Sequence, residues 1–239
     1  MSTFQAQKTR RPKIGASSNG MLMTPEEYDA ITDYDDRFHY ELIHGVLIVS
    51  PFASPSECDP NEELGYLLRL YRDTHADGSA LDQTLFDYYI NLKDSRRRAD
   101  RAIWAGLGRV PDLEKDVPTI VIEFVAKSTR DRIRDYEEKR REYLDLGIKE
   151  SWVIDRYART MTVFRRPDSG AEEAVVKVEA TYRTPLLPGF ELPLARLLTL
   201  ADKWAKRQKK SLTTWFVNRA RLIRVFVRSS PSKSFRSRA

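Results

Sequence analysis

A carboxylate lies within the most apolar stretch of the sequence. Glu123 interrupts a run of β-branched and apolar residues at 119–126, a composition typical of a buried strand. An ionised carboxylate buried there costs several kcal/mol unless a cation or a proton compensates its charge. The sequence therefore predicts that Glu123 has a partner, and the type of partner decides whether it does chemistry.

Asp100 is a second acidic residue with an informative position. It follows the basic run at residues 96–98 and precedes the apolar segment 102–104, so we expect it at the mouth of a strand. If its strand and that of Glu123 are neighbours, the two carboxylates form a site for a hard divalent cation, which prefers oxygen ligands. A second interpretation stays open, in which Glu123 is structural and pairs with one of the many arginines.

Periodicity and turn signals predict the elements that position these residues. Thr24 and Glu27 form a capping box for a helix that begins at Pro25, and Gly45 marks the turn of a hairpin. We expect hairpin strands at 40–43 and 46–50, helices at 60–75 and 131–146, and further strands at 85–92, 101–105, 119–126, 150–155 and 160–165. This order indicates an α/β sheet with helices on its faces.

Composition limits the class of protein. With 239 residues, 41% hydrophobic and 32% charged, the chain can bury a core, so wholesale disorder is excluded. Its longest apolar runs are about half of the roughly 20 residues that a bilayer requires, and its first 20 residues contain no apolar signal region. The single Cys58 excludes an internal disulfide and a multi-cysteine zinc site. We expect a cytoplasmic protein without a membrane segment.

The charge is distributed unevenly along the chain. Residues 1–20 hold four basic and no acidic side chains, and residues 203–239 hold twelve basic and no acidic ones. Residues 21–202 hold 25 basic against 35 acidic side chains, a net charge of −10. We therefore expect a basic N-terminal extension at 1–20, one domain at 21–202 and a basic C-terminal extension at 203–239, with attraction for polyanions located in the extensions.

Several motifs occur in one order along the chain. They lie at residues 24–28 and 40–45, at Asp100 with the two residues before it, and at 118–129, 135–143 and 147–155. Together they resemble the Uma-two family (Uma2) of restriction endonucleases, in the PD-(D/E)XK nuclease superfamily. The resemblance covers roughly residues 21–202. It implies a restriction-endonuclease-like mixed sheet flanked by helices, and magnesium-dependent hydrolysis of DNA phosphodiesters, with manganese as the alternative ion.

The resemblance also implies roles for single acidic residues. Asp100 and Glu123 match the family's motif carboxylates, so both would be catalytic and would bind the metal ion. Glu41 matches an acidic position near the site and would be a third, outer metal ligand. Such a metal would activate a water and offset charge in the transition state.

The catalytic lysine is assigned less directly. Val125 stands where PD-(D/E)XK enzymes usually have lysine, and the resemblance implies a lysine from the following helix, which matches Lys139. Lys127 is the competitor, because residues 123, 125 and 127 share one strand face if the strand extends that far. We favour Lys139 as catalytic, and we expect Lys127 and Arg98 to bind substrate.

From the sequence and this resemblance we therefore expect a magnesium-dependent endonuclease whose partner is DNA, with a homodimer as one assembly. The first alternative is a catalytically silent protein that keeps the nuclease fold to bind DNA or a protein partner. The second alternative is a structural ion-pair core without a site. The geometry around Glu123 is the observation that we expect to separate them.

Overall fold

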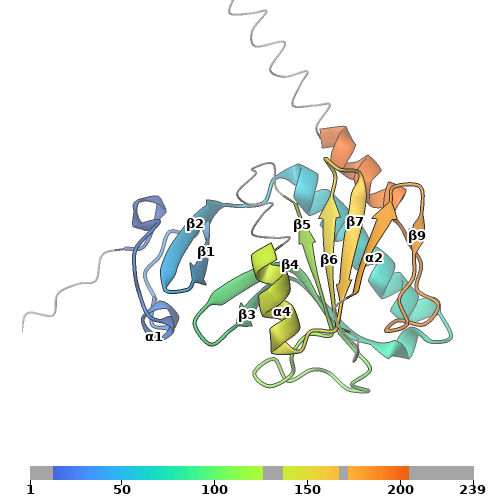
Figure 1. Cartoon of the computed structure of the whole chain (residues 1–239), viewed down its shortest axis with the longest axis horizontal. Helices are drawn as coiled ribbons and strands as arrows, with labels where there is room; N and C mark the ends of the chain where they lie inside the picture. The colour runs from blue at the N-terminus through green and yellow to red at the C-terminus, as the bar shows by residue number, and fades with distance from the viewer. Residues whose placement is uncertain (1–12, 126–136, 167–171, 205–239) are drawn as a thin grey trace, which may run out of the picture.

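A mixed β-sheet with helices on both faces forms the body of the protein, as the computed structural model shows (Figure 1). The structure describes residues 13–125, 137–166 and 172–204. The predicted α/β class is confirmed. The two predicted basic extensions stay predictions, since residues 1–12 and 205–239 lie outside the described residues. In the described part, no helix is long and apolar enough to cross a membrane.

The main sheet contains eight strands in the order β2-β1-β4-β5-β6-β7-β8, and β3 pairs with β4 beside this path. Only β5 and β6 run parallel; the other pairs are antiparallel. The strands are β1 (Phe38–Ile43), β2 (Val46–Pro51), β3 (Leu81–Asn91), β4 (Arg96–Ala105), β5 (Ile120–Phe124), β6 (Glu150–Asp155), β7 (Thr160–Arg165) and β8 (Glu172–Lys177). A small second sheet pairs β9 (Thr181–Tyr182) with β10 (Leu192–Pro193).

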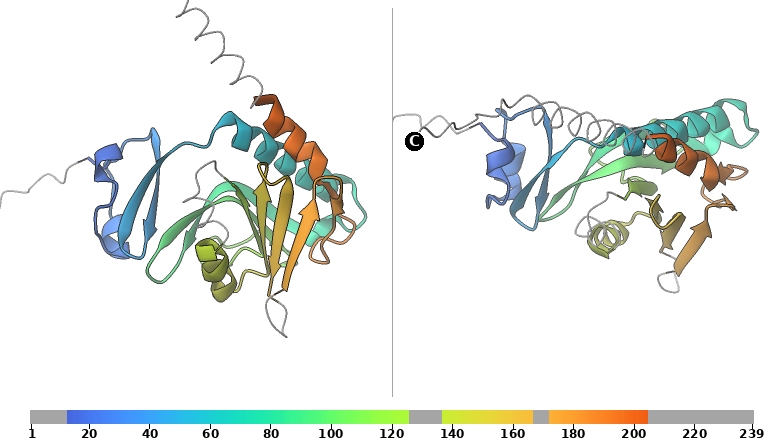
Figure 2. Two further views of the ribbon diagram at one scale, coloured as in Figure 1. Left: turned by 45° about the horizontal axis from the view of Figure 1, so that its top comes forward. Right: turned by 90° about the horizontal axis from the view of Figure 1, so that it is seen from above.

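The helices form one layer on each side of the sheet, as the view from above shows (Figure 2). The long helix α2 (Pro55–Thr74) and the helical residues 194–204 cover one face, and α4 (Lys139–Leu146) covers the other. The larger apolar cluster packs α2 and residues 194–201 against β4 to β7. A smaller cluster packs Tyr143 of α4 against Val121 and Ala99.

The N-terminal elements agree with the predicted signals. Helix α1 (Pro25–Asp29) begins after Thr24, whose side chain accepts from the Glu27 amide while the Glu27 carboxylate accepts from the Thr24 amide. The hairpin turns at His44 and Gly45, with φ of 47° and 78°. Positive φ at both central residues is the turn geometry that matches the twist of paired strands.

Helix α2 begins earlier than the sequence analysis predicted. It begins at Pro55 instead of residue 60, because a second capping box precedes it: the Ser54 amide donates to the Glu57 carboxylate at 2.6 Å. Pro60 lies inside the helix, so this proline did not mark its start. In the predicted helix 131–146, residues 131–136 lie outside the described residues, and α4 ends as predicted at Gly147, with φ of 101°.

Candidate metal and catalytic site

The strand β4 carries Asp100 in its interior. The prediction that Asp100 lies at a strand mouth was wrong, because the arginines at 96–98 pair with β3 and extend β4 to Arg96. Arg97 contacts Glu142 of α4, whereas Arg101, four residues later, contacts Asn61 of α2. Residues an even number apart should share a face. The alternation of β4 is therefore interrupted between these two arginines, at the position of Asp100.

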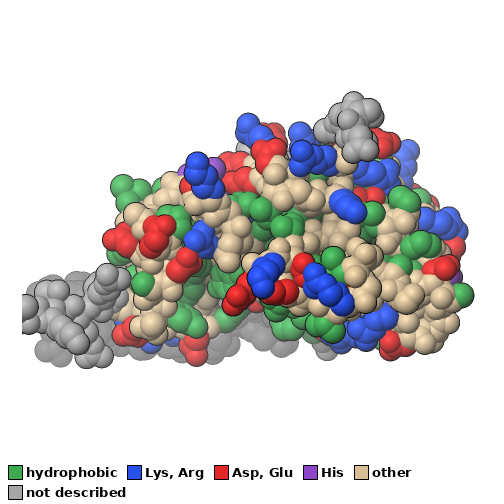
Figure 3. All heavy atoms as spheres, turned by 90° about the horizontal axis from the view of Figure 1, so that it is seen from below, with side chains coloured by type: hydrophobic (Ala, Val, Ile, Leu, Met, Phe, Trp, Pro, Cys, Tyr) green, Lys and Arg blue, Asp and Glu red, His purple; other side chains and the backbone are tan. Residues whose placement is uncertain are grey.

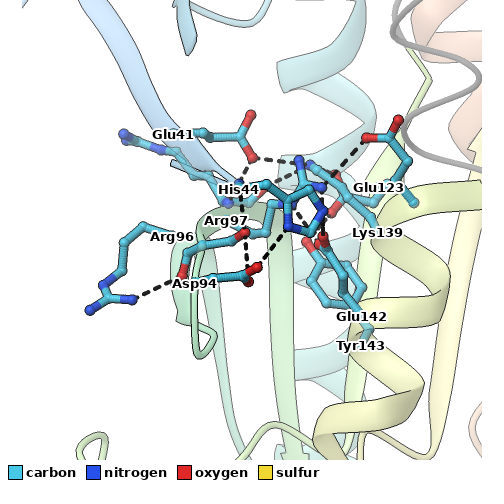
Figure 4. Close-up of polar contacts among 12 residues, drawn as sticks. Glu41, His44, Asp94, Arg96, Arg97, Glu123, Lys139, Glu142 and Tyr143 are labelled. Carbon is cyan, nitrogen blue, oxygen red and sulfur yellow. Dashed lines mark hydrogen bonds and ion pairs between the residues drawn. The ribbon is translucent and has the colours of Figure 1, made fainter. Parts of the chain in front are cut away.

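The main sheet is split beside this interruption. On one edge β4 pairs with β3 at every residue from 96 to 105 except Asp100. On its other edge it pairs with β1 only at Arg96 and with β5 only at residues 101–103. Between these two contacts this second edge of β4 has no neighbouring strand among the described residues. The split lets side chains from β1 and α4 reach the backbone of β4, and the side chain of Glu123 on β5 meets them there (Figure 4).

Lys139 and Tyr143 surround Glu123 at this split. The Lys139 ammonium lies 2.8 Å from Oε2 of Glu123, and the Tyr143 hydroxyl donates to Oε1 at 2.8 Å. Glu123 and Lys139 are each 3% exposed, so the ammonium compensates a carboxylate that would otherwise be costly to bury. Burial, and after it the charge of Glu123, raises the pKa of the Tyr143 phenol well above its ordinary value. Tyr143 therefore remains a hydrogen-bond donor at neutral pH.

Glu41 enters the same cluster from β1. Its Oε1 accepts from the Arg98 amide at 3.0 Å and lies 3.7 Å from the Lys139 ammonium. The ammonium also donates to the Arg98 carbonyl at 2.8 Å. Glu41 and Lys139 thus satisfy backbone groups of Arg98 that would pair with a neighbouring strand in a continuous sheet. Figure 4 shows Glu41 and Glu123 approaching this region from the two sides of the split.

Asp100 lies next to Glu123 across the β4–β5 pair. The register pairs Arg101 with Ile122, and one further step places Asp100 opposite Glu123. The Asp100 carboxylate accepts from the Phe124 amide at 2.5 Å, and its backbone carbonyl accepts from the Asn61 side chain at 2.8 Å. The two predicted motif residues therefore lie opposite each other on adjacent strands.

Of the two predicted substrate-binding residues, Arg98 and Lys127, the structure describes only Arg98. The Arg98 side chain forms an ion pair with Asp87 and lies over the Tyr89 ring, 4.7 Å from its centroid. Its backbone amide and carbonyl contact Glu41 and Lys139. Lys127 lies outside the described residues.

The site also contains residues that the sequence analysis did not single out for this role. Tyr143 had one usable signal, because Lys139 and Tyr143 are four residues apart and share a helix face. Arg97, fully buried, donates to both carboxylate oxygens of Glu142 at 2.6 and 2.8 Å. Glu142 also lies 3.3 Å from His44, so this network fixes α4 against the β1–β2 turn (Figure 4). No local pattern connects residues so far apart in sequence.

The carboxylates of this cluster can be compared with the ligands that a divalent cation requires. Within the ranges that the structure describes, no three side chains of histidine, cysteine, aspartate or glutamate converge as a metal group. Magnesium, however, is usually held by one or two carboxylates, with water completing its octahedral shell. Asp100 and Glu123 supply two carboxylates from opposed positions on adjacent strands, so their chemistry fits a hard cation of this kind.

Comparisons with known proteins agree with this architecture. The family model Uma2, described as "Putative restriction endonuclease", matches residues 25–195. The crystal structure of a "putative nuclease belonging to DUF820" from Anabaena variabilis superimposes with a TM-score of 0.57 and 15% sequence identity. The match covers 75% of this chain and 99% of that chain, and at this identity it shows a shared fold. Comparison with curated proteins gave no match.

Proposed function

The chain belongs to the Uma2 family, and we propose that it is a divalent-metal-dependent endonuclease that hydrolyses phosphodiester bonds in DNA. The observation that carries the proposal is the grouping of Asp100, Glu123 and Lys139 at the split of the sheet, with the Lys139 ammonium 2.8 Å from Glu123. Two carboxylates and one lysine are the groups that the PD-(D/E)XK resemblance implies.

The roles of the residues follow from their chemistry. Asp100 and Glu123 would hold the cation, with Mg²⁺ first and Mn²⁺ as the alternative, and Glu41 would act as an outer ligand through water. When bound, the cation supplies Lewis-acid stabilisation of the phosphate and makes a water more acidic. Lys139 holds a positive charge beside Glu123, where it orients a water or offsets the charge that develops on the phosphate. Tyr143 fixes one oxygen of Glu123 and so leaves its carboxylate in one orientation.

The contacts of Lys139 also agree with the alternative of a catalytically silent protein. The contacts of Lys139 with both Glu123 and Glu41 are those that a structural ion pair would also make. A catalytically silent protein that uses the fold to bind DNA or a protein partner would retain the same contacts. Activity separates these functions, because only the nuclease requires a metal ion.

The test is cleavage of supercoiled and linear DNA by the full chain with Mg²⁺, with Mn²⁺, and with a chelator. Glu123→Gln and Asp100→Asn should each reduce cleavage by at least about a hundredfold, as expected for a lost metal ligand or catalytic group. Glu150→Gln is the matched control, since Glu150 is an equally buried glutamate on the adjacent strand β6. Absence of metal-dependent cleavage by the folded wild type would contradict the proposal.

The two lysines are compared in the same assay. Lys139→Ala should abolish cleavage, whereas Lys127→Ala should retain it if Lys127 contributes only to substrate binding. The opposite result would transfer the catalytic role to Lys127.

A further inference from the structure

A tyrosine-lined hollow of about 270 Å³ lies between α1, β1 and the β3–β4 hairpin. Four tyrosines line it, together with three polar side chains on its wall: Tyr28, Tyr34, Tyr40, Tyr89, Asp29, Asn91 and Arg96. Pockets for drug-sized ligands are typically about 300 to 1,000 Å³. The hollow therefore suits one small group.

Two of the tyrosines form a fixed floor. The other two are about half exposed: the Tyr34 ring packs edge-to-face with Tyr40, and Arg98 covers one face of the Tyr89 ring. The Tyr28 hydroxyl donates to the Tyr40 carbonyl at 2.9 Å, and the Tyr40 hydroxyl donates to the Asp35 carbonyl at 2.7 Å. Tyr34 is 51% exposed and Tyr89 is 43% exposed. Such large exposed rings beside a hollow offer aromatic faces on which a flat ligand stacks.

The wall of the hollow carries both hydrogen-bond donors and hydrogen-bond acceptors. Arg96 forms a two-pronged ion pair with Asp29 at 2.9 and 2.6 Å, and the exposed Asn91 adds an amide that can donate and accept. A planar group with hydrogen-bond donors and acceptors on its edges matches these surroundings better than a purely apolar one.

One residue connects the hollow to the candidate nuclease site. The Arg98 guanidinium lies over the Tyr89 ring at 4.7 Å and donates to its hydroxyl at 2.7 Å. The carbonyl of the same residue accepts from Lys139 and its amide donates to Glu41. The hollow and the carboxylate cluster therefore lie on the two sides of Arg98.

We propose that the hollow binds one unstacked nucleobase of a DNA strand whose phosphodiester lies at the carboxylate cluster. The inference rests on the proposed nuclease function, and it adds a base-binding subsite to it. A base inside a duplex is stacked on its neighbours, so the ligand is a single-stranded or flipped-out nucleotide. Stacking on tyrosine is tolerant of sequence, because every base has a π face.

The test measures affinity for a short fluorescein-labelled single-stranded oligodeoxynucleotide by anisotropy, with the full chain in chelator to prevent cleavage. The comparison strand has the same length and charge but abasic sugars at its central positions. The wild type should bind the base-containing strand about tenfold more tightly than the abasic strand, the size expected for one stacked base. Tyr34→Ala should remove most of this preference, and Tyr34→Phe, which keeps the ring, should retain it.

Tyr66→Ala is the matched control, because Tyr66 is 52% exposed on α2, away from the hollow. This variant should keep the wild-type preference. Equal wild-type affinity for the two strands, or an unchanged preference in Tyr34→Ala, would overturn the base-binding subsite.

The assay separates failure of this inference from failure of the nuclease function. Metal-dependent cleavage without any preference for bases would overturn the subsite and leave the nuclease function standing. A preference for bases that depends on Tyr34, in a protein that cleaves no DNA, would support the subsite and overturn the proposed hydrolysis.

Discussion

Both interpretations of Glu123, as a metal ligand and as half of a structural ion pair, must explain its contact with Lys139. The sequence is compatible with a cation site or a structural ion pair at Glu123. Lys139, which is almost fully buried, contacts both Glu123 and Glu41. Removal of one partner of a buried ion pair leaves an uncompensated charge, which is strongly destabilising. A bound divalent cation at Asp100 and Glu123 would compensate part of that charge.

Lys139→Met should therefore lower the free energy of unfolding by about 3 to 5 kcal/mol in metal-free buffer. Addition of Mg²⁺ should restore more stability to this variant than it adds to the wild type, because the variant has lost a competing positive charge. Urea unfolding with and without Mg²⁺ measures both effects. Arg141→Met, an exposed position two residues along α4, should show neither, and an equal Mg²⁺ effect in Lys139→Met and wild type would contradict the cation site.

Tyr143 gives a prediction about pH. Its phenol pKa is raised in the folded protein, chiefly by burial, and is about 10 in the unfolded chain. Its contribution to stability is therefore fully present below about pH 10 and is lost as the pH rises above that value, where the unfolded phenol ionises first.

Tyr143→Phe has no phenol to ionise. We expect the difference in unfolding free energy between wild type and Tyr143→Phe to decrease as the pH rises from about 8 to 11. Urea unfolding of the metal-free proteins across this range measures the difference, and other alkaline titrations are common to both. A difference that stays constant or grows would show that the pKa of the folded phenol is not raised.

At the scale of elements, α2 holds the part of β4 that carries Asp100. Asn61 donates to the Asp100 carbonyl and accepts from Arg101 Nε at 2.7 Å. Arg101 also donates to the Thr84 hydroxyl. A Cβ at Gly65 would lie 2.7 Å from this buried guanidinium. The close approach of α2 to β4 therefore depends on glycine at this position.

Gly65→Ala should lower the free energy of unfolding by about 1 to 3 kcal/mol through overpacking, although alanine is the better helix former. A shift of Arg101 would also displace Asn61, which holds the backbone of Asp100. The variant should therefore also bind Mg²⁺ more weakly. Chemical denaturation and calorimetric Mg²⁺ titration measure the two effects. Arg69→Ala, on the exposed side of α2, is the control, and a Gly65→Ala protein more stable than wild type would show that Arg101 moves aside freely.

The sequence indicated some elements better than others, for physical reasons. Helix α1, the β1–β2 hairpin and the β6–β7 pair follow from local capping, turn and strand signals, and they occur where predicted. The start of β4 did not follow, because arginines at 96–98 are poor indicators of a strand until β3 pairs with them. The split of the sheet depends on pairing between distant strands, so no local pattern contains it. Asp100 and Glu123 were found because a carboxylate beside apolar residues is unusual, whereas Asn61 is an ordinary residue in a helix.

At the scale of the whole molecule, the charge of the domain and that of its ends are opposite. Residues 21–202 carry a net charge of −10, and acidic and basic side chains are interspersed on the face seen from below (Figure 3). All twelve charged residues after residue 202 are basic. Trp204, whose indole donates to Asp59 of α2 at 2.8 Å, is the last residue that the structure describes.

Truncation after Trp204 should leave the protein folded and its metal affinity unchanged. Affinity for duplex DNA should fall, with the largest loss at low salt, because basic residues release counterions from phosphates in a salt-dependent and sequence-independent way. Anisotropy titrations over a range of salt concentrations measure this loss, and the melting temperature serves as the control. Unchanged DNA affinity, or a large drop in melting temperature, would show that the segment is structural.

The position of a bound cation tests the central proposal most directly. A crystal of the wild type grown with Mn²⁺, measured for anomalous scattering, should contain one strong peak at the split between β1 and β5. The peak should lie within about 2.5 Å of a carboxylate oxygen of Asp100 and of Glu123, and it should be absent from Glu123→Gln. A fully occupied Mn²⁺ site elsewhere in the protein would contradict the metal-dependent nuclease site. So would an ordered site at saturating Mn²⁺ in which no cation binds and Lys139 keeps its contacts with Glu123 and Glu41.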